Sequence, residues 1–191
     1  MSHRQRCHQV LEALLQADPG PGKVAWAVAV AMSAERLGTF LVQRGEPGDA
    51  EAALGYYRRA LAIRESLALA EPDSEEAMRE LSGCLNRLAH VLARRGEPGD
   101  TEAALAYIQR DLEISEALLR VNPDSSEAAC DVAKSHFGCL MFHNSLGSGQ
   151  EAAKSAAACF AILDAFVRER RSMDDEMRKL HAELASELGK P

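Results

Sequence analysis

A long internal repeat limits the fold of this chain more than any other feature of its sequence. The segment 44–54 returns as 95–105, and the segment 71–74 returns as 122–125, in both cases 51 residues later. Gly147 lies a further 51 residues beyond Gly96, and a third copy, shorter by three residues, continues from there. Repeats of this kind are typical of solenoids, in which each copy buries the apolar face of its neighbour.

Each copy has the pattern of two amphipathic helices. Apolar residues recur at helical spacing, for example Val30, Leu37 and Leu41 in the first copy. Gly45 and its equivalents can adopt the left-handed conformation that ends a helix. We therefore predict eight helices, with no competing strand signal, near 3–17, 23–44, 49–70, 74–95, 100–121, 125–146, 150–170 and 173–188.

Capping residues give the expected starts of these helices. Asp49 and Asp100 are expected N-caps, and Asp73 with Glu76 and Asp124 with Glu127 have the spacing of capping boxes. The segment Ser172–Asp175 is a similar start for a last helix, whose apolar stripe contains Met173, Met177, Leu180, Leu184 and Leu188. We expect this helix to cover Phe160, Leu163 and Phe166, as the cap of a solenoid would.

The repeat resembles a known family. Leu37-Gly38, Gly45, the run Ala53–Ile63 and Pro72 are similar to the signature of the tetratricopeptide repeat, and Leu88-Ala89, Gly96, Ala104-Leu105 and Pro123 repeat it. The usual period of that family is about 34 residues, so the chain looks like the long-repeat arrays of bacterial proteins. The resemblance covers about residues 23–170 and implies an all-α fold: a right-handed superhelical solenoid of antiparallel helix pairs with a C-terminal capping helix.

The repeat boundaries divide a single expected domain, 1–191. They are an N-terminal half-repeat at 1–20, repeats at 22–72, 73–123 and 124–171, and the capping helix at 172–191. Residues 10–19 resemble residues 114–123, so the chain opens on the second half of a repeat. Two explanations stay open: a cut from a longer array, or a natural N-terminal cap.

Composition argues against several classes of partner. The net charge is −7 and no basic stripe is present, so we expect no nucleic-acid binding. The longest apolar run, 24–32, is shorter than the ~20 residues of a membrane helix, and the N-terminus lacks a signal-peptide core. We therefore expect a cytoplasmic protein that does not contact membranes.

The five cysteines follow no disulfide or zinc-ribbon pattern. They are expected to be reduced thiols that pack as small hydrophobic residues. By repeat equivalence Cys84, Cys139 and Cys159 fall on core positions, whereas Cys130 should be the most exposed thiol of the repeats.

The resemblance places a binding groove on the first helix of each repeat. The family's chaperone-tail clamp uses Lys and Asn, but Glu35 and Thr39 occupy those places here. Arginine pairs well with carboxylates, and Arg36 and Arg87 are equivalent positions expected side by side on the groove wall. The expected groove residues suit an acidic or C-terminal peptide, and they are Arg36, Asn86, Arg87, His90, Lys134, Phe137 and Met141.

A second candidate surface is the stripe Val24, Val28 and Met32, because the other copies have polar or small residues there. An apolar stripe needs a cover. The candidates are the N-terminal half-repeat, missing upstream sequence, or a second subunit, which would make a homo-oligomer through this end.

The third repeat offers an alternative function. His136, Cys139 and His143 share one helix face and could hold zinc or copper, although their equivalents in the second copy are core leucines. No catalytic motif or phosphate-binding loop occurs. The sequence therefore predicts a scaffold that binds a protein or peptide, without a cofactor or enzymatic activity.

Overall fold

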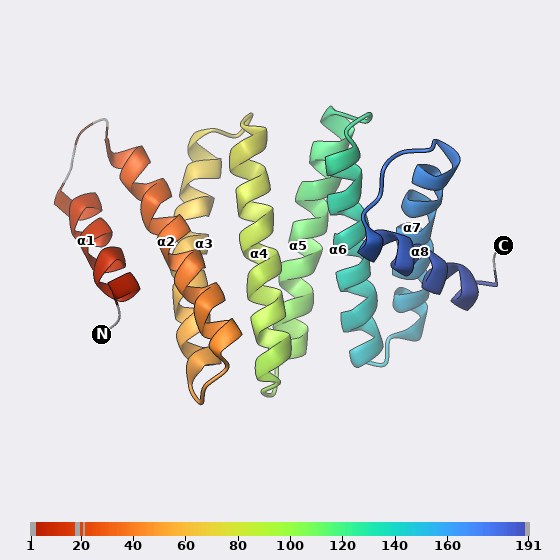
Figure 1. The fold of residues 1–191 in the computed structure, drawn as a ribbon, viewed down its shortest axis with the longest axis horizontal. Coiled ribbons are helices and arrows are strands. Elements are labelled where there is room, and N and C mark those ends of the chain that lie inside the picture. Colours follow the sequence, from red (N-terminus) through yellow and green to blue (C-terminus); the bar gives the residue numbers. More distant parts are fainter. Residues whose placement is uncertain (1–2, 18–19, 21, 190–191) are drawn as a thin grey trace. The chain divides into compact units, whose positions relative to one another are not determined.

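The computed structural model describes residues 3–17, 20 and 22–189, and all their regular elements are α-helices (Figure 1). The chain divides into two compact units, residues 1–100 and 101–191, and each is described by itself. The eight described helices match the predicted ones to within two residues at each end. They are α1 (His3–Ala17), α2 (Lys23–Arg44), α3 (Asp49–Ala70), α4 (Glu75–Arg95), α5 (Asp100–Val121), α6 (Ser126–Ser145), α7 (Gly149–Arg168) and α8 (Asp175–Glu187).

In unit 1, consecutive helices pack against one another from α1 to α4. The buried faces are rich in small and aliphatic residues such as Ala34 and Leu37 on α2, Ala60 on α3 and Leu88 on α4. Small residues allow close packing: a Cβ placed on Gly38 of α2 would lie 2.8 Å from the ring of Tyr57 on α3. Tyr57 is itself buried, and its hydroxyl is 2.9 Å from the Thr39 hydroxyl.

In unit 2, α6 packs against α7, and α8 packs against α7. Met177 and Leu184 of α8 join a buried cluster with Phe160 and Leu163 of α7, as predicted for the capping helix. Phe166 is also buried, and the guanidinium of Arg171 lies 5.5 Å from the centre of its ring. The cluster confirms that α8 covers Phe160 and Leu163, whereas the contact on Phe166 comes from Arg171, before α8 begins.

The consecutive helices α1 to α4 of unit 1, and α6 with α7 of unit 2, are antiparallel neighbours joined by short loops, whereas α8 runs across the direction of α7 (Figure 1). The fold class is therefore the predicted one, an all-α helical repeat. The hand of a superhelix depends on how successive repeats are placed, and it stays a prediction. The boundary between the compact units falls at the start of α5, between the two helices of the second repeat.

The loop between α2 and α3 corrects one capping prediction. Asp49 is the first residue of α3 and not its N-cap, which is Gly48 with φ 84°. The Asp49 carboxylate instead accepts hydrogen bonds from Arg44 Nε at 2.8 Å and from the backbone N–H of Glu46 at 2.9 Å. These hydrogen bonds connect the start of α3 to the end of α2 and to the loop between them.

The second repeat builds the same loop. Asp100 accepts hydrogen bonds from Arg95 Nε at 2.9 Å and from the Glu97 N–H at 2.9 Å. Gly45 and Gly96 end the preceding helices with φ 68° and 66°, as predicted. The repeated motif thus encodes a specific loop structure and not only a helix break.

The other predicted caps also shift by one or more residues. Ser74 and Ser125 are the N-caps of α4 and α6, and their hydroxyls accept hydrogen bonds from the backbone N–H groups of Ala77 and Ala128. They replace the predicted Asp73 and Asp124, because a serine oxygen at this position reaches the N–H three residues ahead. At α8 the cap is Asp174, which accepts a hydrogen bond from Met177 N–H at 2.8 Å, and not Ser172.

The cysteine predictions are confirmed. Cys84, Cys139 and Cys159 are buried, Cys130 is half-buried and Cys7 is exposed. The Cys84 thiol donates to the Tyr57 carbonyl oxygen at 3.6 Å, and the Cys159 thiol donates to the Ala133 carbonyl oxygen at 3.3 Å.

Among the described helices, α2 has the length and apolarity that a membrane span requires. It nevertheless has Glu35 and Arg36 near its middle and packs against both α1 and α3. Its apolar composition is accounted for in part by the core of unit 1, since Val30, Ala31, Ala34, Leu37 and Leu41 are buried there.

Candidate partner-binding site

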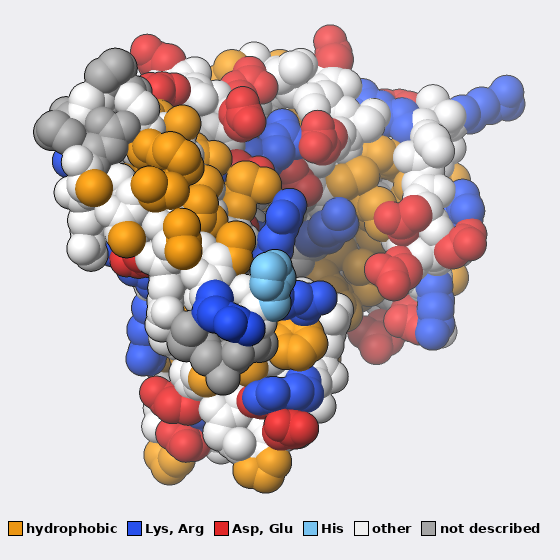
Figure 2. All heavy atoms as spheres, turned by 60° about the vertical axis from the view of Figure 1, so that its left-hand side comes forward, with side chains coloured by type: hydrophobic (Ala, Val, Ile, Leu, Met, Phe, Trp, Pro, Cys, Tyr) orange, Lys and Arg blue, Asp and Glu red, His pale blue; other side chains and the backbone are white. Residues whose placement is uncertain are grey.

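A cleft of about 710 Å³ lies between α1 and α2 in unit 1. Apolar and cationic side chains line it together, and no carboxylate side chain lines its described part. The lining residues are His3, Arg4, Cys7 and Leu11 of α1, with Ala29, Met32, Ser33, Arg36, Leu37, Thr39, Phe40 and Gln43 of α2. Figure 2 turns the N-terminal end of unit 1 forward, where hydrophobic side chains gather next to basic ones.

Three contacts hold α1 in place beside the cleft. Glu12 accepts two hydrogen bonds from Arg59 of α3, from Nε at 2.7 Å and Nη2 at 3.1 Å. The ring of His8 meets the ring of Tyr56 edge-on, with 5.4 Å between centroids. The Arg4 guanidinium lies 4.5 Å from the centre of the Phe40 ring, an arrangement that favours a cation–π contact.

His8 is a buried titratable group at this contact. Burial lowers its pKa, although the nearby Glu12 carboxylate acts in the opposite direction. The Glu12 carboxylate is 3.8 Å from His8 Nε2, and Nδ1 has no hydrogen-bond partner among the described residues. A neutral imidazole therefore fits this position, where it packs against Tyr56.

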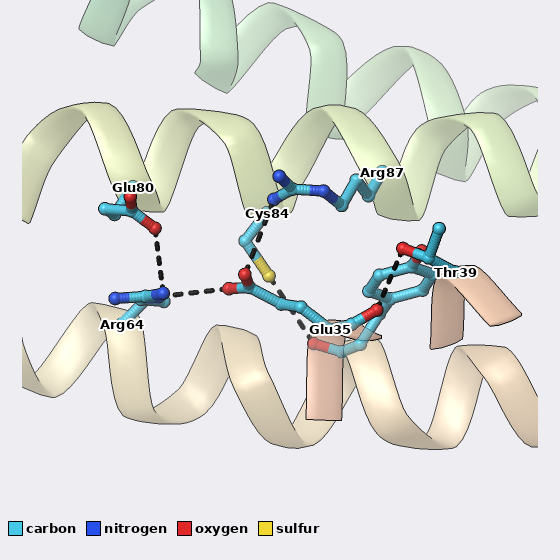
Figure 3. Close-up of polar contacts among 7 residues, drawn as sticks. Glu35, Thr39, Arg64, Glu80, Cys84 and Arg87 are labelled. Carbon is cyan, nitrogen blue, oxygen red and sulfur yellow. Dashed lines mark hydrogen bonds and ion pairs between the residues drawn. The ribbon is translucent and has the colours of Figure 1, made fainter. Parts of the chain in front are cut away.

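Beside the cleft, a cluster of charged residues lies between α2, α3 and α4 (Figure 3). The buried Arg64 of α3 donates from Nε to Glu35 Oε1 at 3.0 Å, and its Nη2 is 2.8 Å from Glu80 Oε2. Arg87 Nη1 of α4 is 3.7 Å from Glu35 Oε2. Glu35 therefore faces two guanidinium groups, and most of its own surface is buried.

This cluster corrects the sequence-based assignment of Glu35 to the groove wall. Glu35 is 7% exposed and serves as the link between three helices. Thr39, the other clamp position, donates to the Glu35 carbonyl oxygen at 2.9 Å and contacts the Tyr57 hydroxyl. Both side chains are engaged in contacts within the protein, although Thr39 is also exposed at the cleft.

Arg36 and Arg87, predicted as equivalent groove cations, have different surroundings. Arg87 is exposed but lies next to the Glu35 carboxylate, which offsets part of its charge. Arg36 is exposed, lines the cleft and has no ion pair or hydrogen bond with another described residue. Arg36 is therefore the better-placed cation for an external carboxylate.

The remaining predicted groove residues of unit 1 lie on α4. His90 is exposed, and Asn86 is half-buried and engaged in interactions within the protein. Of these two residues, only His90 presents most of its side chain to a partner.

In unit 2, the predicted groove residues separate into two kinds. Lys134 is exposed and Met141 is 51% exposed, so both can contact a partner. Phe137 is half-buried and packs against the buried cluster formed by α6, α7 and α8. The capping helix supplies apolar surface there, and burial of an aromatic ring is favourable.

The stripe of α2 remains partly uncovered. Val24 is 53% exposed and Met32 is 40% exposed, whereas Val28 is half-buried. On α1, Val10 is 59% exposed and Leu14 is 38% exposed. The N-terminal half-repeat thus covers part of α2 and adds exposed apolar residues of its own.

The structure does not assemble the alternative metal site. No group of three or more His, Cys, Asp and Glu side chains in the described parts of the chain could hold a metal ion. Burial raises the pKa of the Cys139 thiol to about 11, which disfavours the thiolate that a metal needs. His136 is 3.9 Å from Glu116, and burial lowers its pKa.

The sequence analysis missed the Glu35–Arg64 pair. A signal was present, because Arg64 occupies the repeat position of Ser115, and Glu35 that of Asn86. Polar residues at both positions of two copies indicate a polar contact inside the helix stack, but the pattern does not specify an ion pair.

Comparisons with known proteins give no relative from which a function could be inferred. No protein-family model matches the chain, and no curated protein matches it either. Several solved structures match most of the chain at low identity. The DHF119 filament is 17% identical, with 96% of this chain and 89% of that chain covered and a TM-score of 0.40. The de novo designed helical repeat protein DHR64 is 19% identical, with 94% and 87% covered and a TM-score of 0.34. Such scores do not bear on the function of this chain.

Proposed function

We propose that this chain is a protein-binding scaffold of the tetratricopeptide type, located in the cytoplasm, and that its partner is a protein or peptide with acidic character. The observation that carries the proposal is the position of Arg36. This arginine is exposed at an apolar cleft and has no carboxylate partner among the described residues. A cation beside apolar surface suits an acidic peptide, because a guanidinium can bind a carboxylate through two parallel hydrogen bonds.

Neighbouring side chains support the same class of partner. Arg4 also lines the cleft, and Met32 and Phe40 provide apolar surface. Methionine adapts its shape to different partners. Arg87 and His90 on α4 are further exposed groups of unit 1, although Glu35 offsets part of the Arg87 charge.

Affinity capture with Arg36→Glu tests this function. Partners captured from a cell extract by the wild-type chain and identified by mass spectrometry should be lost or strongly reduced with Arg36→Glu. The control is Arg58→Glu, because Arg58 is also exposed in unit 1 but lies on α3 outside the cleft. Equal capture by the wild type and both variants would remove the cleft from the binding site.

Arg87→Glu is a poor choice for this test. It would place a second carboxylate next to Glu35 and would change stability as well as binding. The double reversal of Arg36 and Arg87 is therefore less informative than the single change at Arg36.

A further inference from the structure

The N-terminal helix α1 has the sequence of a second repeat helix, and no first helix packs before it in the described part of the chain. Val10 of α1 aligns with Ile63 of α3, and Leu14 aligns with Leu67. Ile63 is 7% exposed and Leu67 is half-buried, whereas Val10 is 59% and Leu14 is 38% exposed. The difference has a simple cause: α3 packs between α2 and α4, while α1 packs on α2 and reaches α3 through a few side-chain contacts.

The same comparison applies to α2. Ser33 of α2 aligns with Cys84 of α4. Cys84 is fully buried, with its thiol against the Tyr57 carbonyl oxygen of α3. Ser33 is only half-buried and lines the open cleft between α1 and α2. Arg36, which lines the same cleft, is the equivalent of Arg87, and Arg87 of α4 faces the preceding first helix α2, so a first helix before α2 would pack on this side of it.

The charges show what chemistry such a helix needs. Within unit 1, Arg87 of α4 faces the carboxylate of Glu35 on α2 at 3.7 Å. Arg36 occupies the position of Arg87 one repeat earlier, yet it has no carboxylate partner in the described structure. A helix placed before α2 in the same geometry would meet Arg36 with the residue equivalent to Glu35. A carboxylate at that position would complete the pair.

We propose that the cleft and the exposed face of α1 bind an amphipathic helix of a partner protein, in the position that a first repeat helix would occupy. The apolar stripe of the partner helix packs on Val10 and Leu14 of α1 and on the apolar side chains that line the cleft, and one of its carboxylates pairs with Arg36. This inference rests on the proposed scaffold function and specifies its partner. A second copy is a poorer occupant, because α2, α4 and α6, the first helices of the three repeats, are already packed within their own units.

A peptide with the sequence of α2, 22 residues long, is the matched probe. It carries Glu35 at the position predicted to meet Arg36. Fluorescence anisotropy of the labelled peptide, titrated with the full chain, should show saturable binding with a Kd below about 1 mM. Binding should weaken about fivefold with an Arg36→Glu chain or with a Glu35→Arg peptide, and combining the two changes should restore it.

Changes on α1 separate the proposed helix site from nonspecific adhesion of an apolar peptide. Val10→Asp or Leu14→Asp in the chain should weaken binding at least about tenfold. Leu69→Asp, at a position that is 84% exposed on α3, should leave binding unchanged. Circular dichroism of each variant shows whether unit 1 remains folded.

Three outcomes would overturn the helix site. They are the absence of saturable binding, equal binding by wild type and Val10→Asp, and a homodimer in sedimentation that Val10→Asp dissociates, since a second copy would then be the occupant. The scaffold function is tested separately by partner capture. If capture depends on Arg36 but not on Val10, the scaffold function holds and the helix site does not.

Discussion

Arg64 of α3 and Glu35 of α2 form a buried ion pair with 3.0 Å between Nε and Oε1. Arg64 is 5% exposed and Glu35 is 7% exposed. Removal of a charge from water is costly, so such a pair is tolerated only when each partner remains paired. Arg64 also contacts Glu80, and through these contacts a single side chain links α2, α3 and α4.

Removal of one partner of this pair should destabilise unit 1 strongly. Arg64→Leu leaves the Glu35 carboxylate buried without its main partner, and we expect a loss of about 3 kcal/mol in the free energy of unfolding. The double variant Arg64→Leu with Glu35→Leu should lose much less, because the charges left without a partner, on Glu80 and Arg87, are partly exposed to water. Urea denaturation gives the free energy of unfolding of the double variant and of the two single variants, Arg64→Leu and Glu35→Leu. A loss in the double variant equal to the sum of the two single losses would contradict the interpretation as a coupled pair.

Two glycines should respond in opposite directions to alanine. At Gly38 the added methyl group would lie 2.8 Å from the buried Tyr57 ring, so Gly38→Ala should cost about 1–3 kcal/mol. Gly55 of α3 has open space around it, so Gly55→Ala should stabilise the helix by about 0.5–1 kcal/mol. Thermal unfolding of the two variants gives the comparison, and equal melting temperatures would contradict it.

A second substitution should restore part of the stability that Gly38→Ala loses. The second repeat has Ala89 and Ile108 at the positions of Gly38 and Tyr57. Tyr57→Ile should therefore recover part of the stability lost in Gly38→Ala. If the second change made unfolding easier still, steric conflict with the ring would not be the cause.

The loop carboxylates should make stability depend on acid pH. The hydrogen bonds from Arg44 to Asp49, and from Arg95 to Asp100, hold the pKa of each carboxyl below its ordinary value of 3.8. The folded state therefore binds fewer protons than the unfolded state in this range, so stability rises with pH. The contribution is present above pH 3.8 and is lost as the pH falls through the lowered folded-state pKa.

The variant Asp49→Asn with Asp100→Asn tests this dependence. Its melting temperature should lie below that of the wild type at pH 7, and the gap should narrow as the pH drops below the ordinary carboxyl pKa. Asp73→Asn, at an exposed loop position, is the control. A gap that is constant from pH 7 to pH 3 would mean that these aspartates act without their charge.

The thiols should react in the order of their exposure and ionisation. Burial raises the pKa of Cys84 and of Cys159 to about 12, and that of Cys139 to about 11. Because the thiolate is the reactive form, iodoacetamide at neutral pH should modify the exposed Cys7 first and the half-buried Cys130 next. Mass spectrometry of the native protein follows the order, and labelling in urea is the control. Equal labelling of all five would show that the native core opens readily.

The C-terminal helix should behave as a structural cap. Leu184 is 2% exposed within the cluster of α7 and α8, so Leu184→Ala should cost about 2–5 kcal/mol. Deletion of 172–191 should expose Phe160 and Leu163 and lower the melting temperature further. Lys179→Ala, at an exposed position of the same helix, should have little effect. An unchanged melting curve for the deletion would mean that α8 is a dispensable tail.

The sequence by itself determined the helices and their repeat. Local signals were sufficient, because an amphipathic period of 3.6 residues and a glycine at each helix end depend on near neighbours in the chain. The 51-residue repetition then assigned equivalent positions, so it also predicted the buried thiols and the cap formed by Leu184 and its neighbours. Individual caps were less certain, since Asp73 and Ser74 are both good candidates and only backbone geometry selects Ser74.

The tertiary structure decided which charged residues are available to a partner. Glu35 and Arg36 are adjacent in the sequence and equally polar, yet Glu35 is buried against Arg64 and Arg36 is exposed at the cleft. Likewise Val10 and Ile63 occupy equivalent repeat positions, but only Ile63 has helices on both sides. Burial depends on which helices surround a residue, and that is a property of packing between distant segments that no local pattern specifies.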